Sequence, residues 1–256
     1  MSTNEPAADN RTVAFVAGAT GYVGQQVVRQ LVAAGIRTIA HIRPDSNRLS
    51  EWWTRFTDLG AEPDATPWTL PAMAATLKGL HPRVVFCLLG TTRSRMKSLA
   101  QAGKDPAAAS YESIDYGLTA LLVEAAVHAG NAPRFVYLSS LGAGPNPKGA
   151  YMRWRTRAEH VVLGSGLPYT VVRPAMITGP DREEERRSER IANALVDGAL
   201  SLGKALGFEG SWRRYRSIDA SGLAAAMTRL AMDPAAVNHT IEREELVAEA
   251  PERPVR

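Results

Sequence analysis

The stretch from Gly18 to Gly24 constrains the fold of this chain most strongly. It reads Gly-Ala-Thr-Gly-Tyr-Val-Gly and stands between an apolar run at residues 12–17 and a stretch with helical apolar spacing at residues 21–34. Glycine suits such a strand-to-helix turn because the turn is tight, the backbone must approach a pyrophosphate, and the helix packs closely on the sheet. No Gly-Lys-Ser/Thr follows, which disfavours a P-loop. We expect a dinucleotide-binding turn, with a merely structural turn as the alternative, that uses Gly18, Thr20, Gly21, Tyr22, Val23 and Gly24.

Short apolar runs alternate with longer helix-like stretches along most of the chain. Strands are predicted at residues 12–17, 37–42, 62–65, 83–89, 134–138 and 168–172. Helices are predicted at residues 21–34, 46–59, 71–78, 111–129, 151–163, 191–200 and 221–232. This order predicts an α/β fold, a Rossmann doubly wound parallel sheet with helices on both faces.

No linker or internal repeat divides the 256 residues into independent domains. We expect a disordered polar tail at residues 1–11, a single NAD(P)-binding Rossmann domain at residues 12–240 and a polar tail at residues 241–256. A small C-terminal elaboration at about residues 175–216 is expected on the substrate side, facing a long basic loop at residues 90–110.

Composition excludes several classes of function. Cys87 is the single cysteine, which excludes an internal disulfide and Cys-pair metal sites, and the histidines lack ligand-like spacing. No apolar run reaches the length of a membrane span, and the start lacks an apolar signal segment, so we expect a cytoplasmic protein without a membrane role. The net charge of +4 is not gathered in one basic run, so nucleic-acid binding is not expected.

Arg43 follows the second predicted strand, where an acidic residue would hold the ribose 2′-OH of NAD. An arginine there accommodates a 2′-phosphate, which favours NADP. The alternative is a surface arginine with Asp45 as the ribose ligand.

The chain also resembles the short-chain dehydrogenase/reductase superfamily, particularly its atypical members, which include proteins like the NAD-dependent epimerases and dehydratases. The likeness covers roughly residues 12–173 and continues loosely to about residue 232. Its residues are the glycine turn, Ser139-Ser140 at the end of a strand, Tyr151 at the start of a helix, and Arg173-Pro174. Within this superfamily, the string Leu89-Gly90-Thr91-Thr92-Arg93 resembles the sequence of the subgroup that contains the human Tat-interacting protein.

This resemblance implies catalytic residues. In the family a tyrosine acts as acid or base toward a substrate oxygen, a serine hydrogen-bonds that oxygen, and a lysine four residues after the tyrosine binds the nicotinamide ribose. Ser140, or Ser139, and Tyr151 match, but Arg155 stands in place of the lysine. Arginine keeps the positive charge, although its planar fork does not simply replace an ammonium.

Two functions therefore stay open. One is an NADP-dependent oxidoreductase acting on a small carbonyl or alcohol through Ser140, Tyr151 and Arg155, and an isomerase or dehydratase would use the same residues. The other is a non-catalytic NADP(H)-binding protein with a regulatory or redox-sensing role.

The resemblance further implies cofactor contacts outside the glycine turn, each with a plain structural alternative. Asp115 either balances Arg155 or is an ordinary exposed helix acid. The substrate is not identified, and a homodimer is left open. The expected additional cofactor contacts are Asp64, Leu89, Gly90, Thr91 and Pro174.

Overall fold

The computed structural model describes residues 11–91, 101, 103, 107, 110–175, 177–178, 218–242 and 246. The helix expected at residues 191–200 lies outside them, as do most of the loop at residues 90–110, nearly all of the elaboration at residues 175–216 and most of both tails.

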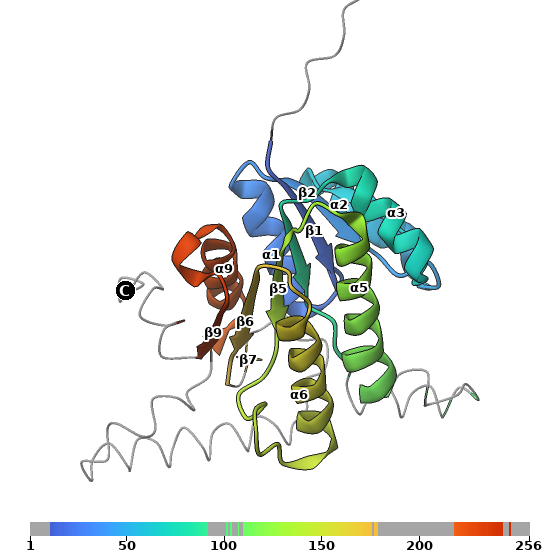
Figure 1. The fold of residues 1–256 in the computed structure, drawn as a ribbon. Coiled ribbons are helices and arrows are strands. Elements are labelled where there is room, and N and C mark those ends of the chain that lie inside the picture. Colours follow the sequence, from blue (N-terminus) through green and yellow to red (C-terminus); the bar gives the residue numbers. More distant parts are fainter. Residues whose placement is uncertain are drawn as a thin grey trace, which may run out of the picture.

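The described chain forms a seven-stranded sheet in which every neighbouring pair is parallel. The strand order is β3-β2-β1-β4-β5-β6-β9 (Figure 1), so the direction of winding reverses between β1 and β4. Ligands of such sheets bind at the carboxyl ends of the strands beside this reversal. The strands are β1 (Val13–Ala17), β2 (Arg37–His41), β3 (Glu62–Asp64), β4 (Val84–Cys87), β5 (Arg134–Leu138), β6 (Tyr169–Arg173) and β9 (His239–Glu242). A separate pair joins β7 (Ile177–Thr178) to β8 (Ile218–Asp219).

Helices cover both faces of the sheet, as Figure 1 shows for α9 on one side and α5 on the other. One core cluster lies under α1 (Tyr22–Ala33), α2 (Leu49–Leu59) and α9 (Ala220–Met232). The other lies under α3 (Leu70–Leu80), α5 (Thr119–Ala129) and α6 (Gly149–Gly164). The strand residues alternate between these clusters, which explains why their sequence is continuously apolar. The predicted doubly wound α/β fold is confirmed.

The structure differs from the expectation in a π-helix and in three short strands that were not predicted, β7, β8 and β9. The helix predicted at residues 111–129 begins as a π-helix, η2 (Tyr111–Leu118), before it continues as α5. The sheet also runs through β9 to Glu242, past the expected domain end at residue 240, and Leu246 beyond it is 1% exposed. A strand as short and polar as His-Thr-Ile-Glu gives little signal, because Ile241 is its only buried residue.

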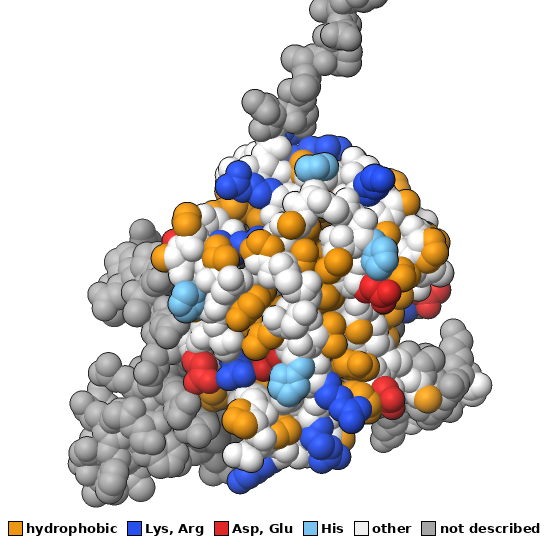
Figure 2. Space-filling model, viewed as in Figure 1, with side chains coloured by type: hydrophobic (Ala, Val, Ile, Leu, Met, Phe, Trp, Pro, Cys, Tyr) orange, Lys and Arg blue, Asp and Glu red, His pale blue; other side chains and the backbone are white. Residues whose placement is uncertain are grey.

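No helix in the described part of the chain combines the length and hydropathy that crossing a bilayer requires. On the face drawn in Figure 2, basic, acidic and apolar side chains are interspersed.

Candidate functional site

The glycine turn lies at the carboxyl end of β1, beside the end of β4. Gly18 has a φ of +84°, and a Cβ placed on it would lie 2.7 Å from the Leu88 carbonyl oxygen. A Cβ on Gly24 would overlap the carbonyl oxygen of Gly18. The two glycines are therefore required by close backbone contacts that no side chain would allow.

The start of α1 offers backbone N–H groups to an anion. Gly21 is the N-cap in an extended conformation, no side chain caps the helix, and its first turn carries no acidic residue. The positive end of the helix dipole and these N–H groups fit the pyrophosphate of a dinucleotide. The Thr20 carbonyl accepts a hydrogen bond from Gln25 Nε2 at 3.2 Å, which helps fix the turn.

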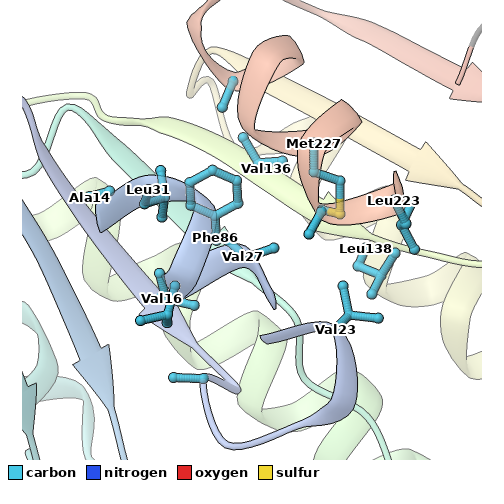
Figure 3. Close-up of a cluster of buried hydrophobic side chains, with 14 of the residues drawn as sticks. Ala14, Val16, Val23, Val27, Leu31, Phe86, Val136, Leu138, Leu223 and Met227 are labelled. Carbon is cyan, nitrogen blue, oxygen red and sulfur yellow. The ribbon is translucent and has the colours of Figure 1, made fainter. Parts of the chain in front are cut away.

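The side chains of two residues of the turn make contacts within the protein. The side chain of Val23 is 7% exposed and lies in the core with Leu138 and Leu223 (Figure 3), so only its backbone faces a ligand. Tyr22 Oη donates a hydrogen bond to the Thr178 carbonyl oxygen at 3.3 Å and so joins the turn to β7.

Arg43 and Asp45, the alternative ligands for the adenosine ribose, bind each other. Arg43 Nη1 lies 3.0 and 3.1 Å from the two carboxylate oxygens of Asp45. The two side chains are 37% and 76% exposed, and exposed ion pairs of this kind contribute little free energy. A ligand phosphate can therefore compete for the guanidinium.

The Asp64 carboxylate accepts hydrogen bonds within the turn that follows β3. Its Oδ2 accepts hydrogen bonds from Thr66 N at 3.1 Å and from Thr66 Oγ1 at 2.7 Å. Thr66 Oγ1 also hydrogen-bonds Thr76 Oγ1 of α3 at 2.8 Å. This geometry favours the turn role over the expected contact with adenine.

Tyr151 and Arg155 lie one helical turn apart on α6. Arg155 Nε donates to Tyr151 Oη at 3.2 Å, and the guanidinium carbon is 5.4 Å from the centre of the tyrosine ring. Arg155 is only 6% exposed. Its Nη1 donates to Tyr137 Oη at 3.1 Å and to the Leu138 carbonyl oxygen at 2.8 Å, both at the end of β5.

Asp115 of η2 is the buried counterion of Arg155, so the alternative of an exposed helix acid is wrong. Its side chain is 0% exposed, and Oδ1 lies 3.0 Å from Arg155 Nη2 as an ion pair without hydrogen-bond geometry. Its Oδ2 accepts the Thr91 N–H at 3.0 Å. A Cβ on Gly90 would lie 2.7 Å from Nη2, so this glycine makes room for the guanidinium.

Electrostatics keep the guanidinium charged. Burial alone lowers the pKa of Arg155, but the oxygens of Tyr137, Tyr151 and Asp115 outweigh it and hold the pKa well above its ordinary value. Burial raises the pKa of Asp115, and the neighbouring Arg155 offsets part of that rise. Each guanidinium nitrogen faces a protein oxygen, so Arg155 does not occupy the position of a free ribose ligand that the family resemblance implies.

The end of β4 and the residues after it pass between the glycine turn and the Asp115–Arg155 pair. Leu89 is 8% exposed and packs in the core, and Gly90 and Thr91 contact the ion pair. Thr91 Oγ1 is buried and has no hydrogen-bond partner within the described residues. A hydroxyl in this position suits a polar ligand atom.

The two candidate serines are distinguished by their contacts. Ser139 Oγ donates to Glu159, which is 3% exposed and also binds Arg173 through Nε at 2.9 Å and Nη2 at 2.7 Å. Ser139 therefore has a structural task. Ser140, half-buried at the end of β5, remains the candidate to bind a substrate oxygen.

Pro174 joins the ends of two strands, because its carbonyl oxygen accepts the Leu141 N–H at 2.8 Å. This contact supports a role in the shape of the site. Most of the basic loop at residues 90–110 and nearly all of the elaboration at residues 175–216, which were expected to face each other on the substrate side, lie outside the described residues.

Sequence reasoning missed Tyr137 and Glu159. Tyr137 is the one residue with a polar tip among residues 135–138 of β5, and Glu159 follows Arg155 at a spacing of four on α6. Residues at this spacing share a helix face, which is a usable signal.

Comparison with known proteins identifies relatives. The chain is 31% identical over 202 residues to the chloroplastic protein TIC 62 of Oryza sativa subsp. japonica, covering 73% of this chain but only 40% of that protein. It is 31% identical over 193 residues to the mitochondrial protein fmp52 of Emericella nidulans, covering 72% of this chain and 73% of that protein. The TIC 62 relatives agree with the subgroup suggested by the sequence.

The solved structure of AtPrR2 with NADP⁺ and (+)pinoresinol superposes with a TM-score of 0.61 at 17% identity, covering 93% of this chain and 74% of that chain. At this identity the likeness shows a shared fold.

The prediction of a cytoplasmic protein is wrong on this comparison, because the relatives bear chloroplastic and mitochondrial names. That prediction rested on the lack of a membrane-length apolar run and of an apolar signal segment, and neither feature determines the compartment.

Residues 18–201 match the family model described as NAD(P)H-binding. This match extends over more than half of the chain and begins at the glycine turn, where the structure shows an uncapped helix start that fits a pyrophosphate. The chain therefore belongs to the NAD(P)H-binding family, an oxidoreductase-like family with a nicotinamide cofactor.

Proposed function

We propose that this chain is an NADP-dependent oxidoreductase of the atypical short-chain dehydrogenase/reductase type that acts on a small carbonyl or alcohol. The observation that carries this proposal is the hydrogen bond from Arg155 Nε to Tyr151 Oη at 3.2 Å. It places a permanently charged group against the phenol of the residue that matches the family acid.

The chemistry follows from these contacts. The bound cofactor supplies or accepts a hydride. Tyr151 Oη already accepts a hydrogen bond from Arg155, so its own O–H donates a proton to a substrate carbonyl oxygen, and the phenolate that forms faces the Arg155 cation. Ser140 hydrogen-bonds the same substrate oxygen.

The experiment measures turnover and NADPH binding on the same samples. Purified protein and Tyr151→Phe are offered NADPH with a panel of small aldehydes and ketones, and cofactor oxidation is followed by absorbance. We expect Tyr151→Phe to lose at least about a hundredfold in kcat while its NADPH Kd stays within about twofold of wild type. Turnover that survives in Tyr151→Phe contradicts the mechanism.

NADP preference rests on Arg43, whose exposed partner Asp45 is easily displaced. Arg43→Ala is expected to weaken NADPH binding about tenfold or more and to leave NADH binding nearly unchanged. The direction in which Asp45→Asn changes nucleotide affinity distinguishes a competing Asp45 from a ribose-binding Asp45. It strengthens NADPH binding if Asp45 only competes for Arg43, and it weakens NADH binding if Asp45 holds the ribose.

A second candidate is a non-catalytic NADP(H)-binding protein. The observation in its favour is that each nitrogen of Arg155 faces a protein oxygen, so the family's ribose contact and proton relay through a lysine have no counterpart. Tight NADPH binding with no turnover over the whole panel, in wild type and Tyr151→Phe alike, supports this candidate against the first.

A further inference from the structure

Tyr151 has an aromatic neighbour that no sequence pattern assigned to the site. Tyr111, the first residue of η2, packs on Tyr151 with ring centres 5.1 Å apart and ring planes inclined by 60°. Tilted aromatic pairs at this separation are attractive beyond the apolar area they bury. Arg155 therefore holds the phenol through its hydroxyl, while Tyr111 contacts the ring.

The η2 segment that carries Tyr111 is held at its start and at Asp115 in its middle. At its start, Ser110 Oγ caps the helix by accepting the Ser113 N–H at 3.1 Å, and Ser113 Oγ donates to the Ala107 carbonyl oxygen at 2.9 Å. Further along, buried Asp115 pairs with Arg155. Tyr111 therefore contacts Tyr151 from a helix that is anchored by hydrogen bonds and by an ion pair.

We propose that Tyr111 is a positioning residue for Tyr151, fixing the plane of the phenol ring whose oxygen Arg155 holds. This inference rests on the proposed function for its effect on turnover, but its effect on the Tyr151 ring is independent of turnover. Small displacements of an acid cost large factors in rate, so fixing a phenol from two sides has a measurable consequence.

The test compares three variants with wild type. Tyr111→Ala removes the ring, Tyr111→Phe keeps it, and Tyr116→Ala is the matched control from the same π-helix. The ring of Tyr116 packs on a different residue of α6, Trp154, with ring centres 5.5 Å apart. Each protein is measured for its thermal midpoint, for NADPH Kd, for kcat and KM, and for the rate at which tetranitromethane nitrates Tyr151, read by peptide mass spectrometry.

We expect Tyr111→Ala to raise the nitration rate of Tyr151 several-fold and to lower kcat by roughly threefold to tenfold, with NADPH Kd within about twofold of wild type. Tyr111→Phe restores both rates, because the ring makes the contact. Tyr116→Ala lowers the thermal midpoint like Tyr111→Ala but leaves nitration of Tyr151 and kcat at the wild-type values.

The inference is overturned if Tyr111→Ala leaves nitration of Tyr151 unchanged, or if Tyr116→Ala raises it equally, since a general loosening of η2 then explains the effect. It is also overturned if Tyr111→Phe behaves like Tyr111→Ala. If wild type shows no turnover, the proposed function fails, but the nitration rates still decide whether Tyr111 holds the Tyr151 ring.

Discussion

The two halves of the candidate site are built in different ways. The glycine turn is local, since its shape follows from Gly18 and Gly24 and from one contact with the backbone just after β4. The half around Tyr151 is assembled from side chains of β5, η2 and α6 and from the backbone of the chain after β4. Backbone sterics therefore shape the half proposed to bind the cofactor (the cofactor half), whereas a buried charge network shapes the half proposed for catalysis (the catalytic half).

The buried ionisable groups of the two halves also differ in charge. His41, at the end of β2, is 2% exposed, and burial lowers its pKa below 6.5. Its Nε2 hydrogen-bonds the Thr66 carbonyl oxygen at 2.9 Å, which suits a neutral imidazole. The catalytic half instead buries a charged pair, Asp115 and Arg155. Removing a neighbouring group therefore costs less folding free energy at a buried neutral side chain than at one member of a buried ion pair.

The largest expected effect follows from breaking that pair. Asp115→Ala leaves the Arg155 cation buried without its counterion and should lower the free energy of unfolding by about 3–5 kcal/mol, measured by urea denaturation. The double variant Asp115→Leu with Arg155→Met removes both charges and should recover most of this loss. If the losses of unfolding free energy caused by removing each side chain instead add up in the double variant, the two side chains do not act as a pair.

A smaller effect is expected at Gly90, where the catalytic half approaches the cofactor half. Gly90→Ala places a methyl group 2.7 Å from Arg155 Nη2 and should cost about 1–3 kcal/mol of stability. In an Arg155→Lys background the cost should shrink, because Nη2 is gone. Gly79→Ala is the matched control, since it lies in helix α3 with no atom within 4 Å of the added Cβ. An equal cost of Gly90→Ala in both backgrounds would contradict the contact.

The mildest effect concerns pH and the cofactor half. Between the lowered pKa of folded His41 and the ordinary value of 6.5, the unfolded chain binds more protons than the folded one, so stability falls as pH drops below 6.5. The slope should reach at most about 1.4 kcal/mol per pH unit. His41→Gln, which keeps a donor for Thr66 but does not titrate, should remove that part of the pH dependence in urea titrations. A wild-type and variant difference that stays constant with pH would refute a buried neutral histidine.

The sequence predicts the sheet well because its strands are continuously apolar and its helices are periodic, as at residues 134–138, where the predicted and observed strands coincide. It also locates Tyr151 and the glycine turn, which depend on local spacing. It offers Asp115 as the counterion of Arg155 only as one of two alternatives, and it does not predict the contact of Arg155 with Tyr137, because these partners lie far along the chain from Arg155 and meet it only in the folded protein. The spacing of Glu159 from Arg155 places both on one helix face, but its partners Ser139 and Arg173 come from neighbouring strands and are not evident from that spacing.

The most direct test of this account is a calorimetric titration of NADPH, NADP⁺, NADH and NAD⁺ into wild type, Gly24→Ala and Gly79→Ala. The account predicts that wild type and Gly79→Ala bind NADPH alike, and that Gly24→Ala, confirmed as folded by circular dichroism, loses at least about a hundredfold in affinity because the turn cannot close. Wild-type protein that binds none of these nucleotides, or a folded Gly24→Ala that binds NADPH as wild type does, would contradict it.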